Sequence, residues 1–497
     1  MNDPAFTPLP LSDLAGPESP RGQNPMIAGI SEDSRAIRPG YLFAAIPGKR
    51  QDGAAFIPAA LAAGAVAVLA VPETLVPEGV PVIRDPHPRA RLSHLASALF
   101  AHAQPPFIAA VTGTSGKTST VCLAQQIWNL LGQNAASLGT IGLVTSTGSE
   151  YGSMTTLAPV ALHAKLAALA AGGVSHLAFE ASSQGLDQHR PDAVRLRAAA
   201  FTGFGRDHLD DHLTIEAYLQ AKLRLFSELL PADGIAVLNG DMSAFSSARD
   251  ICQKRGIRVI SYGSQPHCSW RITDHKLTNN GQSFQLVTQS ATHAVTLPLA
   301  GRFQAYNVLA AMALVHADET PLEKIIAVLP RLQGVPGRLH YVGAHPCGAA
   351  VYVDYAHKPD ALEEILNALR AHTPGRLWVV FGCGGNRDSG KRALMGQIAQ
   401  RLADAVIVTD DNPRHEDAAA IRRAIMANCP KAVEMGDRAQ AIHTAIHSLA
   451  QGDVLVIAGK GHESGQIVGE QVFPFDDIEI AKSILAQLSP ENTSHAV

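Results

Sequence analysis

The feature that most constrains the fold is a glycine-containing loop between a short apolar run and a helix-forming stretch. The run FIAAV is followed by TGTSGKTST, which contains Gly113, Gly116, Lys117 and Thr118. The phosphate-loop pattern G-x-x-x-x-G-K-S/T has a glycine where this chain has Val111. A strand, a glycine turn and a helix still aim backbone N–H groups and a helix dipole at an anion. The stretch therefore predicts nucleotide binding within an α/β sheet.

The side chains of this loop suggest what each residue would contact. Lys117 would reach the terminal phosphates of a nucleotide, and the Thr118 hydroxyl would ligate Mg²⁺. The alternative to nucleotide binding is a glycine-rich turn with an exposed lysine and no ligand. The strand before the loop and the helix after it favour the nucleotide. The predicted ATP-binding residues of the loop are Gly113, Thr114, Ser115, Gly116, Lys117, Thr118 and Ser119.

The distribution of apolar runs predicts an α/β protein of three domains, because 497 residues are too many for one core. We expect a smaller N-terminal α/β domain at 1–103 and a central P-loop-type domain with a mostly parallel sheet at 104–336. A Rossmann-like C-terminal domain would follow at 337–497. The boundaries fall near the segments AQPP (103–106) and GVPGR (334–338).

Within these blocks, the runs predict individual elements. FIPAALAAGAVAVLAV predicts a helix, a glycine turn and a buried strand, and HLAFEAS, RAAAFTGF and GIAVLN predict strands that alternate with helices. Period-two runs between about 257 and 300 predict a small antiparallel insertion. RLWVVFGCGG, DAVIVTDD and DVLVIAGKG each end in glycines or acids. Ligands of open α/β sheets bind at such carboxyl ends.

The composition excludes several functional classes. A net charge of −4 argues against a general nucleic-acid or anionic-membrane binder, and six cysteines without a C-x-x-C pair favour a reducing cytosol over disulfides or structural zinc. The first residues lack the basic start and apolar run of a signal peptide, and the longest apolar stretch is too short to span a bilayer. We therefore expect a soluble, cytoplasmic protein that neither binds nucleic acid nor inserts into a membrane.

Two further residues could ligate a metal ion. Glu180 ends one apolar run, and His208 lies among acids just past another. A helix cap could explain the acid and a structural role the histidine. Their joint position at strand ends of a nucleotide-binding domain favours a metal site, although Mg²⁺ prefers oxygen ligands.

Separated motifs in one fixed order resemble those of the Mur ligase family of peptidoglycan synthesis. The motifs are the loop, EASSQGLDQHR, RDHLD, GVPGR, DYAHKPDALE, GCGGNRDSGKR, DDNPRHE and AGKGHE, and the similarity runs from about Ser31 to Asp476. The chain looks most like the members that add the third residue of the stem peptide. The resemblance implies three domains that bind UDP, ATP and the incoming amino acid in turn, in a protein that we expect to be monomeric.

The implied reaction converts UDP-MurNAc-L-Ala-D-Glu, ATP and meso-diaminopimelate into a UDP-tripeptide, ADP and phosphate. A carboxylate is a poor electrophile, so the γ-phosphate would first be transferred to it, giving an acyl phosphate that an amine can attack. Transfer between two anions requires charge neutralisation, which Lys117 and two Mg²⁺ ions would supply.

The resemblance also implies roles for individual residues. Thr118 and Glu180 match the first magnesium site, and His208 lies near the second. Lys222 matches a lysine that the family carries as a carbamate (N6-carboxylysine), whereas a plain helical lysine would be a solvated surface residue. Lys117, Glu180, His208 and Lys222 are thus the expected catalytic residues.

Substrate contacts follow from the same matches. The UDP-MurNAc-dipeptide would contact Ser34, Lys49, Arg50, Gln51, Thr155, Thr156, Ser182, Gln188 and Arg190. ATP would also contact Asn307, Arg338, Asp354, Tyr355 and His357. Diaminopimelate would contact Arg387, Asp411, Asn412, Pro413, Arg414, Gly459 and Glu463.

Arg414 is the residue that predicts the choice of amino acid. Diaminopimelate carries a distal carboxylate that lysine lacks, and a guanidinium can bind both of its oxygens. Pro413 would stiffen the turn that presents Arg414, and Glu463 suits the distal ammonium. Rejection of lysine then follows from the cost of an unpaired buried arginine.

Three residues depart from the family pattern, and three other functions are possible for the chain. Ser115, Gln184 and Gln304 stand where the family commonly has Asn, His and Asn, which puts details of substrate contact in doubt. A folylpolyglutamate synthase would lack the first block and the Asn-Pro-Arg turn, and a lysine-adding ligase is opposed by Arg414. Retention of Lys117 and Lys222 argues against an inactive nucleotide-binding scaffold.

Overall fold

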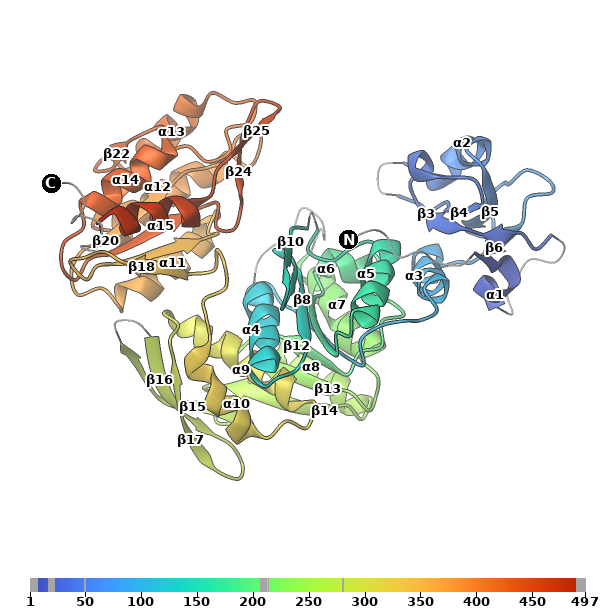
Figure 1. Cartoon of the computed structure of the whole chain (residues 1–497), viewed down its shortest axis with the longest axis horizontal. Coiled ribbons are helices and arrows are strands. Elements are labelled where there is room, and N and C mark those ends of the chain that lie inside the picture. Colours follow the sequence, from blue (N-terminus) through green and yellow to red (C-terminus); the bar gives the residue numbers. More distant parts are fainter. Residues whose placement is uncertain are drawn as a thin grey trace. The chain divides into compact units, whose positions relative to one another are not determined.

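The computed structural model describes residues 8–16, 23–48, 51–152, 154–205, 212, 214–278 and 281–488. The chain forms two compact units, the first made of 1–269 with 309–325 and the second of 270–308 with 326–497. Figure 1 shows the elements of each unit in sequence colours. The three domain boundaries given above stay a prediction, because the first unit takes in all of the first expected domain and part of the second. Among the described residues, no helix has the length and apolar character needed to cross a membrane.

The first strands of the chain build a small parallel sheet in the order β3-β4-β5-β6. Ala67 and Leu69 of β5 pack with α3, whereas Val68 and Ala70 pack with α2. This alternation covers both faces with helices, as a parallel sheet requires (Figure 1). The predicted helix, turn and strand in 56–71 are confirmed. The elements are β1 (Leu9–Pro10), α1 (Leu11–Ala15), β2 (Met26–Ile27), β3 (Gly29–Ser31), η2 (Ser34–Ala36), β4 (Tyr41–Ala44), η3 (Gly53–Phe56), α2 (Ile57–Ala62), β5 (Ala65–Ala70), β6 (Val82–Arg84) and α3 (Pro88–Leu99).

The larger sheet of the first unit has the order β10-β9-β8-β11-β7-β12-β13-β14, parallel from β8 to β14 along that row. All six residues of β7 are buried, which fits a strand covered on both faces. The predicted central parallel sheet is confirmed. Its elements are β7 (Phe107–Thr112), α4 (Lys117–Leu130), β8 (Ala135–Gly139), β9 (Gly142–Thr145), β10 (Gly148–Glu150), α5 (Pro159–Ala171), β11 (His176–Glu180), α6 (Ser183–Asp187), β12 (Ala198–Phe201), α7 (Ile215–Arg224), η4 (Leu225–Leu229), β13 (Ile235–Asn239), α8 (Phe245–Lys254) and β14 (Arg258–Gly263).

The second unit begins with an antiparallel set of strands, as the period-two pattern predicts. These are β15 (Trp270–Thr278), β16 (Gly281–Val287) and β17 (Thr292–Leu297). Helices α9 (Arg302–His316) and α10 (Leu322–Val328) each cross a boundary between the units, and η5 (Leu329–Arg331) follows them.

A Rossmann-like sheet in the order β18-β19-β23-β20-β21-β22 completes the second unit. Its strands are parallel except β18, so β19, β20, β21 and β23 end at one edge. Phe381 of β20 packs with α11 and α12, and its neighbour Val380 packs with α14 and α15. The elements are β18 (His340–Ala344), β19 (Ala350–Asp354), α11 (Pro359–Arg370), β20 (Leu377–Phe381), α12 (Gly390–Leu402), β21 (Ala405–Val408), α13 (Ala418–Met426), β22 (Val433–Glu434), α14 (Arg438–His447), β23 (Val454–Ala458), β24 (Gly465–Val468), β25 (Gln471–Pro474) and α15 (Asp477–Leu488).

Candidate active site

The glycine loop lies between β7 and α4, as the sequence predicts, and its conformation depends on two glycines. Gly113 has φ +154°, and a Cβ atom there would lie 2.1 Å from Thr202 Oγ1. Thr202 Oγ1 donates a hydrogen bond to the Ser115 carbonyl at 2.6 Å, which holds the loop against β12. Gly116 has φ +85° directly before the first residue of α4. Side chains with a Cβ atom rarely adopt these angles, so the loop needs glycine at both positions.

Two lysines meet at the carbonyl of Gly113. Lys117 Nζ donates to the carbonyl oxygens of Gly113 at 2.8 Å and Thr114 at 3.1 Å. Lys222 Nζ, from α7, donates to the same Gly113 oxygen at 3.0 Å and lies 4.4 Å from the centre of the Tyr218 ring. Lys222 is 1% exposed, so the alternative of a solvated surface lysine is wrong. The loop and α7 together therefore concentrate positive charge where phosphate oxygens would bind.

Glu180 ends β11 and is 1% exposed. Its two oxygens accept hydrogen bonds from Thr140, one from the backbone N at 2.7 Å and one from the hydroxyl at 3.1 Å. A Cβ atom on Gly139 would lie 2.2 Å from Glu180 Oε1, so that glycine leaves room for the carboxylate. The sequence analysis missed Gly139 and Thr140. Their only signal is their position at the end of the neighbouring strand β8.

The donor set in this unit fits the magnesium ion that the family implies. The Thr118 hydroxyl and the Glu180 carboxylate are both buried oxygen donors, and Mg²⁺ prefers oxygen. Lys222 suits a cation only as a carbamate, because an ammonium would repel it. His208 lies outside the described residues. Within the part of the chain that the structure describes, no group of three His, Cys, Asp or Glu side chains is arranged to hold a metal.

Several residues predicted to bind the UDP-MurNAc-dipeptide form one hydrogen-bonded cluster. Thr156 Oγ1 donates to the Glu180 carbonyl at 2.8 Å and lies 3.0 Å from Ser182 Oγ. Arg190 Nη1 donates to the Thr156 carbonyl at 2.6 Å, and its Nε and Nη2 donate to Gln188 Oε1 at 3.1 and 2.7 Å. Burial lowers the pKa of Arg190 from its ordinary value.

The remaining members of this set lie apart from the cluster or outside the description. Thr155 Oγ1 is 3.1 Å from Thr140 Oγ1, which links it to the donor of Glu180. Ser34 begins η2, and Gln51 is an exposed residue before η3. Lys49 and Arg50 lie outside the described residues. Gln184 is exposed on the short helix α6.

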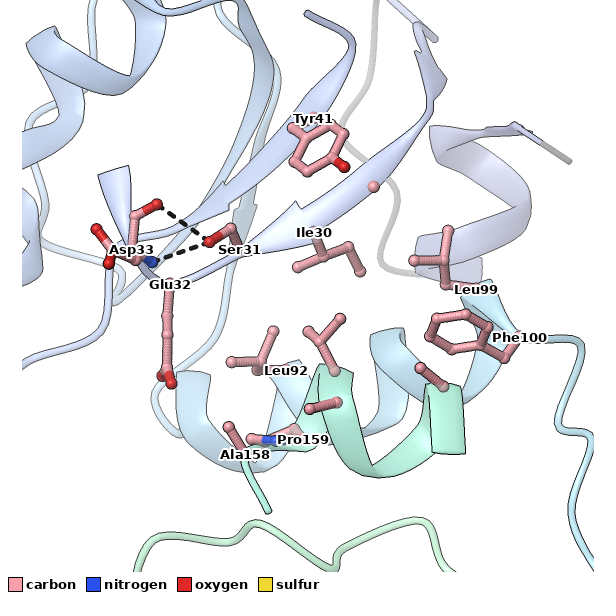
Figure 2. Close-up of a pocket in the computed structure, with 14 residues that line it drawn as sticks. Ile30, Ser31, Glu32, Asp33, Tyr41, Leu92, Leu99, Phe100, Ala158 and Pro159 are labelled. Carbon is pink, nitrogen blue, oxygen red and sulfur yellow. Dashed lines mark hydrogen bonds between the residues drawn. The ribbon is translucent and has the colours of Figure 1, made fainter. Parts of the chain in front are cut away.

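A cavity of about 370 Å³ adjoins these elements in the first unit (Figure 2). Its walls are mostly apolar, and polar side chains lie at the end near the turn after β3. In that turn Ser31 Oγ donates to the Asp33 carbonyl at 3.1 Å and accepts from Asp33 N at 3.0 Å. The lining comes from β3, α3 and the start of α5, and includes Ile30, Ser31, Glu32, Asp33, Tyr41, Leu92, Leu99, Phe100, Ala158 and Pro159.

The ATP-binding residues expected beyond the loop lie in the second unit. Arg338 lies over the Tyr355 ring, with its guanidinium carbon 4.8 Å from the ring centre. Asp354 Oδ2 accepts from Leu339 N at 2.6 Å and Oδ1 from Ala356 N at 2.7 Å. Burial raises the pKa of Asp354 to about 6, against the opposing effect of the Arg338 charge. Burial lowers the pKa of His357, whose Nδ1 lies 2.8 Å from the Tyr355 carbonyl, to about 4.

Gln304, one of the departures, connects two of these residues. Its Nε2 donates to the Arg338 carbonyl at 3.2 Å, and its Oε1 accepts from Asn307 Nδ2 at 3.0 Å. The amide therefore links Asn307 to Arg338 within this unit. The loop residues 113–119 belong to the first unit.

The predicted diaminopimelate residues gather at the carboxyl edge of the Rossmann-like sheet. Arg414 has φ +51°, and backbone hydrogen bonds from Arg414 N to Ile467 O (3.0 Å) and from Gly469 N to Arg414 O (2.7 Å) hold it against β24. Arg414 Nη1 donates to the Gly385 carbonyl at 2.9 Å. Gly459 has φ +119°, and a Cβ atom there would lie 2.7 Å from Asp411 Oδ2.

Asn412 lies at the centre of this group. Its Nδ2 donates to Glu463 Oε2 at 2.8 Å, and its Oδ1 accepts from Lys460 Nζ at 3.0 Å. Pro413 is buried, whereas Arg387 is exposed in the loop after β20. The structure thus brings Asn412, Arg414 and Glu463 into one site with Arg387 on a neighbouring loop. Lys460 is a residue of this site that the sequence analysis did not assign.

Comparison with known proteins agrees with this architecture. Three family models match: the Mur ligase family, catalytic domain at 26–99, the Mur ligase middle domain at 111–315, and the Mur ligase, glutamate ligase domain at 337–461. A Bradyrhizobium diazoefficiens protein named UDP-N-acetylmuramoyl-L-alanyl-D-glutamate–2,6-diaminopimelate ligase is 50% identical over 93% of this chain and 95% of its own length. A Caulobacter vibrioides protein of the same name is 48% identical over 94% and 97%.

Solved structures give the same result. One structure of that name, at 33% identity, covers 97% of this chain and 99% of its own, with a TM-score of 0.74. A Mycobacterium tuberculosis folylpolyglutamate synthase complexed with ADP, at 17% identity, covers 75% of this chain and 92% of its own with a TM-score of 0.60, and shows a shared fold alone. Because one relative is 50% identical over 93% of this chain and three family models match it, the chain belongs to the Mur ligase family.

Proposed function

We propose that the chain is an ATP-dependent ligase that joins meso-2,6-diaminopimelate to UDP-MurNAc-L-Ala-D-Glu, giving the UDP-tripeptide, ADP and phosphate. The observation that carries this proposal is the group of Asn412, Arg414 and Glu463 at one sheet edge, in a chain 50% identical to a protein named for that activity. A guanidinium and a carboxylate suit the distal carboxylate and ammonium of a diamino acid.

The first step transfers the γ-phosphoryl group of ATP to the substrate carboxylate. The substrate carboxylate attacks the γ-phosphorus of ATP, the bond to the bridging oxygen of ADP breaks, and an acyl phosphate forms. Lys117 and the backbone N–H groups of the loop bind the phosphate oxygens, and they neutralise charge that would oppose the approach of two anions. In the structure Lys117 donates to the carbonyl oxygens of Gly113 and Thr114 in the same loop.

Magnesium and the carbamate of Lys222 are parts of the proposal. Thr118, Glu180, His208 and carbamylated Lys222 would hold the ion, which would neutralise phosphate charge. Carbamylation requires a neutral Lys222 amine to react with CO₂.

The second step uses the diamino acid. Its amine attacks the acyl carbon, phosphate leaves, and the amine loses a proton as the amide forms. Arg414 would hold the distal carboxylate and Glu463 the distal ammonium, so lysine would leave the guanidinium without its anion. The UDP-MurNAc-dipeptide would contact Ser34, Lys49, Arg50, Gln51, Thr155, Thr156, Ser182, Gln188 and Arg190.

The cavity in Figure 2 is the proposed location for the uridine end of this substrate. It lies in the sequence neighbourhood of Ser34 and Thr156, and its apolar walls suit a planar base. A monomeric state, a cytoplasmic location and the three domain boundaries remain parts of the same proposal.

The mechanism can be tested by an isotope experiment that traces the carboxylate oxygen atoms of the substrate. UDP-MurNAc-L-Ala-D-Glu with ¹⁸O in its free carboxylates is incubated with protein, ATP, Mg²⁺ and diaminopimelate in bicarbonate-containing buffer. An acyl phosphate predicts one ¹⁸O atom in each phosphate released, because the attacking carboxylate oxygen leaves with phosphorus. Phosphate without ¹⁸O would contradict the acyl-phosphate step, and absence of any tripeptide would contradict the ligase itself.

A further inference from the structure

Lys460 is a buried cation at the carboxyl end of β23. Its side chain is 0% exposed, although lysine is rarely buried fully. A buried ammonium is costly unless hydrogen bonds replace its water, so its partners identify what the position is for.

Both partners that the structure gives Lys460 belong to the proposed diamino-acid site. Nζ donates to Asn412 Oδ1 at 3.0 Å and to Glu463 Oε2 at 3.3 Å. Asn412 Nδ2 donates to the same Glu463 oxygen at 2.8 Å. The three side chains therefore close a triangle in which each one touches the other two.

This triangle fixes the direction of the Asn412 amide. Oδ1 accepts from Lys460 Nζ and from Ile467 N at 2.9 Å, so the amide oxygen faces two donors. A flipped amide would aim its NH₂ group at an ammonium and an N–H group, and it would lose the bond to Glu463. Lys460 and the Ile467 N–H together set which edge of Asn412 faces the carboxylate.

In the same triangle, one carboxylate oxygen of Glu463 is occupied by hydrogen bonds from the protein. Oε2 accepts from both Lys460 and Asn412, and no hydrogen bond to Oε1 occurs within the described part of the chain. The Glu463 side chain is 33% exposed, so its second oxygen is the one positioned for a ligand ammonium. Ile467 extends the network, because its carbonyl accepts the backbone N–H of Arg414 at 3.0 Å.

We propose that Lys460 is a positioning residue for the diamino acid, and this inference rests on the function proposed above. Its ammonium orients the Asn412 amide and the Glu463 carboxylate, and through Ile467 it connects them to the strand that holds Arg414. Glu463 and Arg414 would contact the distal groups of the amino acid, whereas Lys460 acts only through them.

The test replaces Lys460 with an apolar side chain of similar length. In full-length Lys460→Met, the KM for diaminopimelate is expected to rise about tenfold to hundredfold, because two hydrogen bonds to a buried charge are lost. The KM for ATP should stay unchanged. Lys482→Met is the matched control, since Lys482 lies on α15 of the same unit with its side chain 50% exposed.

A merely structural role would give a different result. Loss of folded protein lowers the apparent kcat and leaves every KM unchanged, and this outcome would overturn the proposal. Lys460→Gln, which keeps an N–H donor, should raise the same KM less than Lys460→Met does. In a Glu463→Gln background, Lys460→Gln should add little, because the charged partner of Lys460 has already been changed. Full additivity of the two substitutions would also overturn it.

The wild-type protein separates this inference from the proposed function. Wild-type turnover with diaminopimelate, together with unchanged KM values in both Lys460 variants, would overturn only the role of Lys460. Failure of the wild-type protein to use diaminopimelate would overturn the proposed function and the inference that depends on it.

Discussion

The glycine loop after β7 and the Asn-Pro-Arg loop after β21 both follow parallel strands, yet they are built differently. The first is held largely through main-chain oxygens, with Lys117, Lys222 and Thr202 all donating to carbonyls of residues 112–115. The second is also held by side chains of separated segments, with Asn412 bonded to Lys460 and Glu463, beside the backbone hydrogen bonds that hold Arg414 against β24. Backbone N–H groups of such a loop suit a phosphate, whereas side chains suit the recognition of one particular amino acid.

The largest effect should come from the charge in the first loop. Lys117→Met is expected to lower kcat about 10³-fold, since it removes a donor aimed at the phosphoryl group in transfer. The KM for diaminopimelate should stay unchanged, as measured by phosphate release. Lys254→Met at the exposed end of α8 is the control. A kcat within a few-fold of wild type would show that this lysine does not assist transfer.

In the second loop, a substitution should change KM rather than kcat. Arg414→Ala is expected to raise the KM for diaminopimelate about hundredfold, because a charged hydrogen-bonded pair is lost, and to leave the KM for ATP unchanged. Discrimination against L-lysine should fall in the same variant. Arg401→Ala, which removes an arginine that is 60% exposed on α12, is the control. Unchanged use of both amino acids would show that Arg414 does not determine which amino acid is used.

The dependence of the first loop on glycine predicts a smaller loss. Gly113→Ala would place a methyl group 2.1 Å from Thr202 Oγ1, so the loop must shift. We expect kcat/KM for ATP to fall about tenfold, since small displacements at a phosphate site are costly. Adding Thr202→Ala should recover part of the loss if the contact causes it. Identical ATP kinetics in Gly113→Ala and wild type would contradict the steric argument.

A buried histidine of the scaffold should affect stability rather than catalysis. Burial of His163 on α5 lowers its pKa to about 4. As pH falls from about 6.5 to about 4, the unfolded chain binds a proton that the folded chain excludes, so stability is lost by about 1.4 kcal/mol per pH unit. His163→Gln should flatten the fall in urea midpoint between pH 7 and pH 5. Parallel curves for variant and wild type would contradict this assignment.

The contrast between the loops also explains what the sequence could predict. The strand, glycines and helix of the first loop are contiguous in the chain, and their spacing reflects backbone geometry, so both the fold and the position of Lys117 follow from it. Glu180 was predicted as a polar residue at a strand end. Its donor Thr140 was not, because that contact depends on the parallel pairing of β8 with β11, which leaves no local pattern.

Long-range packing accounts for the other omissions. Lys222 lies in a helix whose pattern suggests a surface position, and the loop packed against it helps to bury the side chain. Lys460 and Asn412 are 48 residues apart, so the bond between them is invisible in either segment. The family resemblance supplied residues such as Asn307 and Arg338, whereas the link between them through Gln304 required the structure.

We propose that the second loop makes this chain select diaminopimelate over lysine. The most direct measurement compares kcat/KM for meso-diaminopimelate and L-lysine with purified protein, ATP, Mg²⁺ and UDP-MurNAc-L-Ala-D-Glu, scored as tripeptide formed. The predicted result is tripeptide with diaminopimelate and about a hundredfold lower kcat/KM with lysine. Equal or better use of lysine would contradict the assignment of specificity to Arg414.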